Sequence, residues 1–324
     1  MLLGNQVTVF GGTGFVGNSV INELSKSGYQ VRVVVRRPER YREIMLFPNA
    51  KLFTLDSFDN GEQLKESVKG TDIVFNLTID RTTATEMVEQ DELSHVAQKI
   101  KSACESAGVK RVLSLSQIGA SNNAPNQQWC GVLGEVDNFM HNVANAESTV
   151  FKTSLLIGEG DQTTQKYINQ LHRISILPVA YAKTIVQPLW IKDFAKAMVA
   201  TIKQTDTFGQ KLDVVGEERL TIKALAELTA ELMQKEAMVF GMCSLNAKIM
   251  SKLGGLAPVA SVSKAQLITL SEDTISEADF SKQFGFVPSS LEWCIAKYAA
   301  PSDVRQRFNY FRKEAGRDGQ DIAS

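Results

Sequence analysis

Short apolar runs alternate with amphipathic stretches along the first half of the chain. The apolar runs have strand length and read QVTVF, QVRVVV, KLFTL, DIVFNL, RVLSLS and TVFKTS. Stretches with apolar residues at helical spacing separate them, over residues 15–26, 38–46, 61–68, 85–107 and 130–145. Continuous apolar strands between such helices indicate a parallel sheet covered on both faces. We therefore predict a doubly wound α/β fold of the Rossmann type, with its ligand at the carboxyl ends of the strands.

The alternation loosens after about residue 158. A short strand is predicted within residues 184–190, and helices over 192–202 and 221–234. Later segments of this kind commonly form a smaller lobe beside the cofactor cleft, because ligand pockets lie between domains. We predict three parts, which are a dinucleotide-binding domain at 1–158, a smaller carboxyl-terminal α/β lobe closing over the cleft at 159–300, and a tail at 301–324.

A glycine-rich turn joins the first predicted strand to the first predicted helix. Gly11, Gly14 and Gly17 form a GxxGxxG pattern between them. Such a turn lets the backbone approach a pyrophosphate and points the helix amino terminus at it. We therefore predict a dinucleotide site with contacts from Gly11, Thr13, Gly14, Phe15 and Val16.

Two arginines follow the second predicted strand, where NAD-binding proteins carry an acidic residue for the adenosine ribose. Arg36 and Arg37 stand at this point, within VVVRRPER. A guanidinium suits a 2′-phosphate and leaves a plain ribose without its acceptor. We therefore predict NADP(H) as the cofactor. The alternative is a solvated basic loop.

Three further residues are predicted to line the cofactor cleft. Leu77 and Thr78 follow the fourth predicted strand, and Asp56 ends the third. The Asp56 carboxylate is expected to accept a hydrogen bond from the adenine amino group, with an exposed turn aspartate as the alternative.

Composition and charge exclude several classes of protein. The formal net charge is -1 over 324 residues, so no global field attracts nucleic acid. The four cysteines are far apart and form no CxxC pattern, so neither a disulfide framework nor a metal site is predicted. No signal peptide pattern and no run of roughly 18 apolar residues occurs. We predict a cytoplasmic protein without a membrane span, and leave peripheral membrane association open.

Several motifs of the chain occur together in one protein family. They are VFGGTGFVG, VVVRRPER, GTDIVFNL, AGVKRVLSLSQIGA, the Gly134-Glu135 pair and QPLWIKDFAKAM. With these motifs the chain resembles the atypical short-chain dehydrogenases/reductases, over roughly residues 5 to 300. Within that family it is similar to the NAD(P)H-binding accessory subunit of respiratory complex I and its bacterial relatives. The resemblance implies bound NADPH, often without a known turnover, and a respiratory-complex or membrane-peripheral partner.

The same resemblance implies three site positions after the fifth predicted strand. Active members of the family carry a serine at the strand end and a Tyr and a Lys four residues apart on the next helix, which together assist proton transfer. Ser116 stands at the serine position. Counting back from Gly134-Glu135 in the pattern YxxxKxxGE puts Gln127 at the tyrosine position and Gly131 at the lysine position. Neither can replace the lost group.

The sequence therefore predicts a protein that binds NADP(H) in a respiratory-complex-associated or assembly role, without Tyr/Lys-type turnover. Two alternatives stay open. One is a reductase or epimerase that uses a substitute acid, for which Tyr167 and Tyr181 are candidates. The other is a regulatory protein that senses the redox state of the cofactor.

Two later segments carry candidate surface chemistry. In the tail, Val304, Phe308 and Phe311 lie at helical spacing among basic residues, which predicts an amphipathic helix for a membrane surface or a partner groove. Packing of that helix on its own domain is the alternative. Residues 242–268 are apolar with lysines as their only charges, and are expected to form either a core helix or a docking face.

Overall fold

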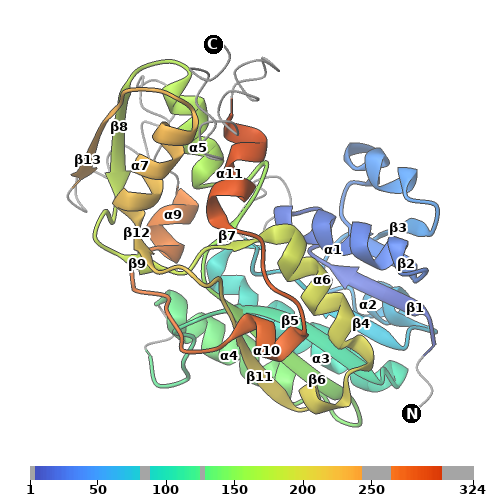
Figure 1. The fold of residues 1–324 in the computed structure, drawn as a ribbon. Helices are drawn as coiled ribbons and strands as arrows, with labels where there is room; N and C mark the ends of the chain where they lie inside the picture. The colour runs from blue at the N-terminus through green and yellow to red at the C-terminus, as the bar shows by residue number, and fades with distance from the viewer. Residues whose placement is uncertain (1–3, 81–87, 125–127, 243–263, 301–324) are drawn as a thin grey trace.

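The computed structural model describes residues 4–80, 88–124, 128–242 and 264–300 (Figure 1). The tail at 301–324 and most of the apolar segment at 242–268 lie outside the described residues. Gln127, at the expected tyrosine position, also lies outside them.

Seven parallel strands form the central sheet. They are β1 (Gln6–Phe10), β2 (Gln30–Val35), β3 (Ala50–Thr54), β4 (Ile73–Asn76), β5 (Arg111–Gln117), β6 (Glu147–Thr153) and β11 (Gln210–Val214). Their order is β11-β6-β5-β4-β1-β2-β3, and neighbouring strands pair in parallel. The order reverses between β1 and β4, so the carboxyl ends of these two strands form the switch point at which doubly wound proteins bind ligands. The predicted fold class is confirmed.

Helices cover both faces of this sheet (Figure 1). On one face, α1 (Phe15–Lys26) packs against α6 (Ile191–Ala200). On the other, α2 (Gly61–Val68), α3 (Leu93–Ala107) and α4 (Trp129–His141) pack side by side. The apolar sides of these helices and the strands between them join in one buried core. The core therefore holds α1 and α4 at fixed places beside the strand ends.

A second group of elements gathers at the upper left of Figure 1. It contains β7 (Leu156–Ile157), α5 (Thr164–Leu171), β8 (Ile176–Ala180), β9 (Ile185–Val186), β10 (Leu189–Trp190), β12 (Leu220–Thr221), α7 (Ile222–Leu232), β13 (Met238–Met242), α9 (Lys264–Thr269) and α11 (Leu291–Ala299). β8 pairs in parallel with β13, and α5 packs against α7. The short helix α10 (Phe280–Phe284) lies lower in Figure 1, apart from this group.

Four predicted elements differ from the structure, and the first is the helix predicted over 130–145, which is α4 and ends at His141. Residues 38–46 form two 3-10 helices, Pro38–Arg40 and Arg42–Leu46, because Tyr41 between them has non-helical backbone angles. The strand predicted within 184–190 is two strands in separate sheets, with Pro188, which has no N–H to donate, between them. The helix predicted from 85 begins at Leu93 and follows the 3-10 turn Gln90–Glu92.

One buried arginine joins the far end of the sheet to the chain that leads into β11. Arg111, the first residue of β5, has no exposed surface. Its guanidinium donates to the Glu147 carbonyl at 3.0 Å, to Thr149 Oγ1 at 2.8 Å, to the Thr201 carbonyl at 3.1 Å and to Thr207 Oγ1 at 3.2 Å. Buried charges are tolerated where hydrogen bonds satisfy them, so this network is structural. Arg111 lies at the amino end of β5, away from the ligand end of the sheet.

Candidate cofactor-binding site

The turn between β1 and α1 packs directly on the end of β4. Gly11 has a φ of +75°, and a Cβ built there would lie 2.5 Å from the Leu77 carbonyl oxygen. A Cβ on Gly17 would lie 2.5 Å from the Gly11 carbonyl oxygen. Both positions therefore require glycine, and their close packing directs the amino terminus of α1 at the switch point.

The first pocket lies between this turn and the ends of β2, β3 and β4. Its lining residues are Gly11, Thr13, Gly14, Val34, Val35, Arg36, Leu55, Phe58, Leu77, Thr78, Asp80 and Val88. Six residues predicted from the sequence thus meet here, namely Gly11, Thr13, Gly14, Arg36, Leu77 and Thr78. The apolar part suits an adenine ring, and Arg36 brings a positive charge to its rim.

Two predicted residues, Arg37 and Asp56, line neither this pocket nor the second one described below. Arg37 is exposed and begins the turn into Pro38–Arg40. Asp56 is exposed, and its Oδ2 accepts a hydrogen bond from Gln63 Nε2 at 2.7 Å. The Asp56 backbone N–H donates in return to Gln63 Oε1 at 3.0 Å. Asp56 therefore holds the loop before α2 in this structure.

The second pocket continues from the first toward β5 and the second group of elements. Its lining residues are Phe15, Val16, Ile79, Asp80, Leu115, Ser116, Gln117, Trp129, Thr153, Ser154, Leu155, Leu156, Gln162, Thr163, Gln266, Thr269, Leu270 and Thr274. Phe15, Val16 and Ser116, three predicted residues, are among them. Asp80 lines both pockets, so they adjoin at this residue. A dinucleotide could extend from one pocket into the other past the amino terminus of α1.

Gln117 ties the wall of the second pocket together. Its Oε1 accepts a hydrogen bond from the indole N–H of Trp129 at 2.7 Å, and its Nε2 donates to the Thr269 carbonyl at 2.7 Å. These bonds connect the end of β5 with the start of α4 and the end of α9. The wall is thus built from three segments that lie far apart in the sequence.

Asp80 occupies the amino terminus of α1. The cap residue Gly14 has no side chain to accept from the first turn, and Asp80 Oδ2 accepts from the Val16 backbone N–H at 2.9 Å. The unpaired N–H groups at a helix start attract anions, and a pyrophosphate would compete with this carboxylate for Val16. The residues therefore fit a dinucleotide at the glycine turn and at both pockets, while Asp80 opposes it at the phosphates.

We expect Asp80→Asn to tighten NADPH binding about three- to tenfold. The amide keeps an oxygen for the Val16 N–H but removes a negative charge next to the phosphates, an effect of about 1 kcal/mol at a partly exposed helix terminus. Calorimetric titration measures the change. Asp206→Asn, which removes an exposed carboxylate outside both pockets, is the control. Weaker binding by Asp80→Asn would show that the charge supports the site.

Ser116 lies beside a buried carboxyl group on α4. Asp137 is 1% exposed, and neither its carboxyl oxygens nor Ser116 Oγ has a hydrogen-bond partner among the described residues. Burial raises the pKa of Asp137 to about 6, although the nearby Ser116 hydroxyl and the Lys152 and Lys211 charges act to lower it. The sequence motifs did not reveal Asp137, because the signal is its contact with a strand far away in the chain.

The position expected for the lysine and the two tyrosines considered as substitute acids supply no proton donor to the described lining of the second pocket. Gly131 is buried in α4 and offers no side chain. Tyr167 is 1% exposed on α5, and burial raises its pKa. The Tyr181 hydroxyl donates to the Leu267 carbonyl at 3.4 Å. Neither tyrosine lines the second pocket, where Asp80 is the titratable side chain among the described lining residues.

Part of the chain matches a known protein family, and longer parts are similar to individual proteins. Residues 11–156 match the NAD(P)H-binding family. The chain is 26% identical over 238 residues to "NADH dehydrogenase [ubiquinone] 1 alpha subcomplex subunit 9, mitochondrial" of Arabidopsis thaliana, a match that covers 72% of this chain and 59% of that protein. The protein of the same name from Mus musculus is 24% identical over 299 residues, which cover 89% of this chain and 78% of the mouse protein.

A solved structure extends the likeness of fold to most of the chain. The Citrobacter sp. triphenylmethane reductase complexed with NADP(H) has a TM-score of 0.70 at 16% identity, with 91% of this chain and 99% of that chain covered. The chain therefore carries an NAD(P)H-binding domain, and most of it shares the fold of that solved structure.

The part of the chain that the structure describes lacks two features that would change the class of site. No helix in this part of the chain is both long and apolar enough to cross a bilayer. Within the same ranges, no three His, Cys, Asp or Glu side chains are grouped as metal ligands would be.

Proposed function

From the NAD(P)H-binding domain at 11–156 and the similarity to respiratory complex I subunits, we propose that this chain holds NADP(H) in a respiratory-complex-associated or assembly role, without Tyr/Lys-type turnover. The observation that carries the proposal is the pair of adjoining pockets at the switch point. They place a glycine turn, Arg36 and Ser116 along one cleft, while Gly131 leaves the expected lysine position without a side chain.

The preference for NADP(H) over NAD(H) rests on Arg36. This side chain follows β2 and is exposed at the rim of the first pocket, where an adenosine ribose would end. A 2′-phosphate there gains a charge-assisted hydrogen bond, whereas a plain ribose does not.

We expect Arg36→Ala to weaken NADPH binding about 10- to 150-fold, since a hydrogen bond to a charged group contributes about 1.5 to 3 kcal/mol. NADH binding should stay within about twofold of the parent protein, because NADH lacks the phosphate. Calorimetric titration of the variant with NADPH and with NADH measures both effects. Arg40→Ala, in the same basic segment but outside the pocket lining, is the matched control. An unchanged NADPH constant would assign Arg36 to a solvated loop.

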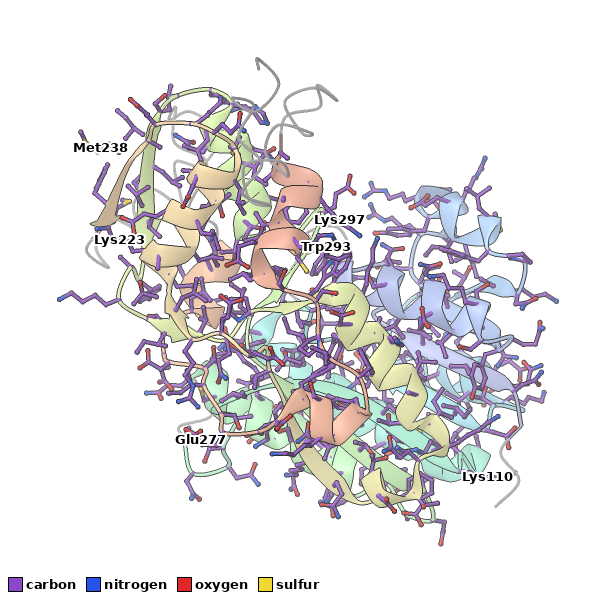
Figure 2. All side chains as sticks on the ribbon, in the orientation of Figure 1. Lys110, Lys223, Met238, Glu277, Trp293 and Lys297 are labelled. Atoms are coloured by element: carbon purple, nitrogen blue, oxygen red, sulfur yellow. The ribbon has the colours of Figure 1, made fainter. Side chains whose placement is uncertain are left out.

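An exposed apolar face on β8 and β13 supports the proposal of a protein partner. Ile176 on β8 is 45% exposed, and Met238 and Phe240 on β13 are 68% and 43% exposed. Met238 lies at the outer edge of the molecule in Figure 2. Neighbouring exposed apolar side chains of this kind mark interaction surfaces more often than isolated ones do.

The redox-sensing alternative has one specific observation in its favour, the buried Asp137 carboxyl beside Ser116. A reductase or epimerase that uses Tyr167 or Tyr181 is less favoured, because neither hydroxyl lines the second pocket.

A further inference from the structure

A buried polar cluster lies behind the wall of the second pocket. Within the described residues, both Asp137 carboxyl oxygens, Ser116 Oγ and His141 Nδ1 are buried without a hydrogen bond of ordinary geometry, although the Ser116 hydroxyl still acts on the Asp137 carboxyl. Buried polar atoms are nearly always paired, so such a cluster requires an explanation. Ser116 is the member that also lines the second pocket. Ser116 therefore lies between Asp137 and a ligand in the second pocket.

Charged groups face Asp137 from the strands beneath α4. Lys152 is the register neighbour of Ser116 on β6, and its Nζ donates to the Ala120 carbonyl at 3.3 Å. Lys211 on β11 is exposed. On α4 itself His141 lies one turn after Asp137, and burial together with Lys211 lowers the pKa of His141. The Ser116 hydroxyl and the two lysines offset the effect of burial only in part, so the pKa of Asp137 is raised to about 6.

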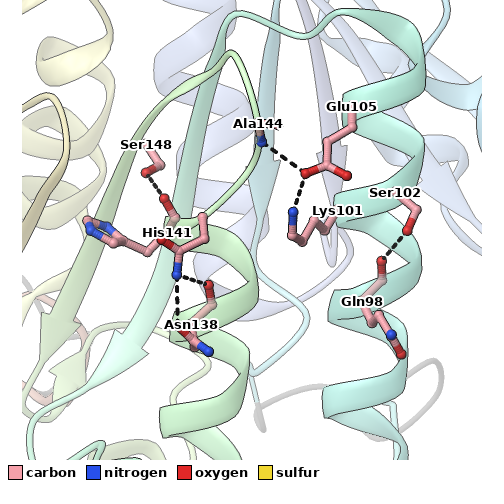
Figure 3. A network of polar contacts seen from close by, with 9 residues as sticks. Gln98, Lys101, Ser102, Glu105, Asn138, His141, Ala144 and Ser148 are labelled. Atoms are coloured by element: carbon pink, nitrogen blue, oxygen red, sulfur yellow. Dashed lines mark hydrogen bonds and ion pairs between the residues drawn. The ribbon is translucent and has the colours of Figure 1, made fainter.

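The end of α4 is fixed by its own contacts (Figure 3). Ser148 Oγ donates to the His141 carbonyl at 2.6 Å, and Asn142 Nδ2 donates to the Asn138 carbonyl at 2.9 Å. On the side of α3, Glu105 Oε1 accepts from the Ala144 backbone N–H at 2.9 Å and pairs with Lys101. Lys101 and Glu105, the charged side chains of α3 labelled in Figure 3, are thus paired with each other. Asp137 is held against β5 by a helix that cannot easily shift.

We propose that Asp137, acting next to Ser116, makes the nicotinamide end of the second pocket selective for the oxidised, positively charged form of the cofactor. The inference rests on the proposed cofactor function. A carboxylate in a buried setting attracts a cation strongly, because little solvent screens the pair. The reduced nicotinamide ring is neutral and gains nothing from the same charge. Asp137 would therefore let the protein respond to the redox state of the cofactor.

The sign of the pH dependence follows from linkage. A positive ring near Asp137 favours the ionised carboxyl and lowers its pKa. Binding of the oxidised cofactor near pH 6 therefore releases a proton from Asp137. Affinity for the oxidised form then rises with pH, by about tenfold for each pKa unit of interaction. The phosphates of the cofactor also titrate, but they are common to both forms and cancel in the ratio of the two constants.

The test is calorimetric titration of the full chain with NADP⁺ and NADPH from pH 5.5 to pH 8. We expect the ratio of the NADPH to the NADP⁺ dissociation constant to rise about threefold across this range, because part of the change falls below pH 5.5, and to stay flat in Asp137→Asn. Asp80 is unchanged in that variant, so its charge contributes equally to both proteins. Glu135→Gln removes the same charge from the face of α4 that lines a groove with α3, and should keep the rise.

A second measurement does not depend on any variant folding. In two buffers of different ionisation enthalpy at pH 6, the unaltered protein should release more protons on binding NADP⁺ than on binding NADPH, because the phosphate contribution is common to both forms. A ratio that does not change with pH in the unaltered protein, or an equal rise in folded Asp137→Asn, would overturn the inference alone. Failure to bind either form would overturn the cofactor function, and the inference with it.

Discussion

Protein saturated with NADPH is expected to oxidise it about a hundred- to ten-thousandfold more slowly than a reductase that has the Tyr/Lys pair. General acid–base assistance contributes a factor of this size, and the remaining hydride transfer would depend on proximity alone. The measurement offers carbonyls, quinones and sugar nucleotides in turn. It follows nicotinamide absorbance through single and multiple turnovers.

The structure gives this expectation its physical reason. Ser116 can orient an oxygen, but its hydroxyl is a far weaker acid than a phenol activated by lysine. Gly131 has no side chain, and the hydroxyls of Tyr167 and Tyr181 lie outside the pocket lining.

Rapid multiple turnover on any substrate would contradict the binding role. Variants would then identify the acid. Loss of activity in Tyr167→Phe or Tyr181→Phe would assign it to a tyrosine, and loss in Asp137→Asn would assign it to the carboxyl behind Ser116.

Replacing Gly17 with alanine is expected to lower the free energy of unfolding by about 3 kcal/mol and to weaken NADPH binding at least about a hundredfold. The new Cβ would lie 2.5 Å from the Gly11 carbonyl oxygen and from Gly12 backbone atoms, which cannot rotate away as a side chain can. The helix must move off the turn, and a displacement of about 1 Å at a positioned site costs about a hundredfold. Thermal or urea unfolding and calorimetric titration measure the two effects.

Gly61 provides the matched control. It is the first residue of α2, a Cβ there would meet nothing within 4 Å, and its φ is not positive. Gly61→Ala should therefore leave cofactor binding unchanged and stability equal or slightly higher. If Gly17→Ala behaved in the same way, the close approach of α1 to the turn would not matter for binding.

Much of the fold follows from hydrophobic periodicity. The predicted bounds of α1 and α2 agree with the structure because each helix follows a turn and buries one apolar face. The β1–α1 turn was also readable, since its glycines occur at fixed spacing between a strand and a helix. The same reasoning placed Arg36 at the rim of the first pocket, because a residue after a strand end is fixed by the strand itself.

Contacts between distant segments could not be read from these patterns. Asp80 caps α1 across 64 positions of the sequence, and Asp137 meets Ser116 only because α4 packs on β5. From the sequence alone, a polar residue in a predicted helix is expected to face solvent, and only its neighbours in the structure show that it is buried. The short run Gln210–Val214 gave no sign that it would extend the main sheet beside β6.

The buried guanidinium of Arg111 affects the order in which the chain can fold. Its acceptors include the Thr201 carbonyl and Thr207 Oγ1, so residues near 200 must arrive before the charge at the start of β5 is satisfied. A nascent chain released up to β6 would hold this arginine with its acceptors at Glu147 and Thr149 but without those at Thr201 and Thr207. The cofactor-binding half therefore cannot complete its own sheet during synthesis, and it forms only with the segment that leads into β11.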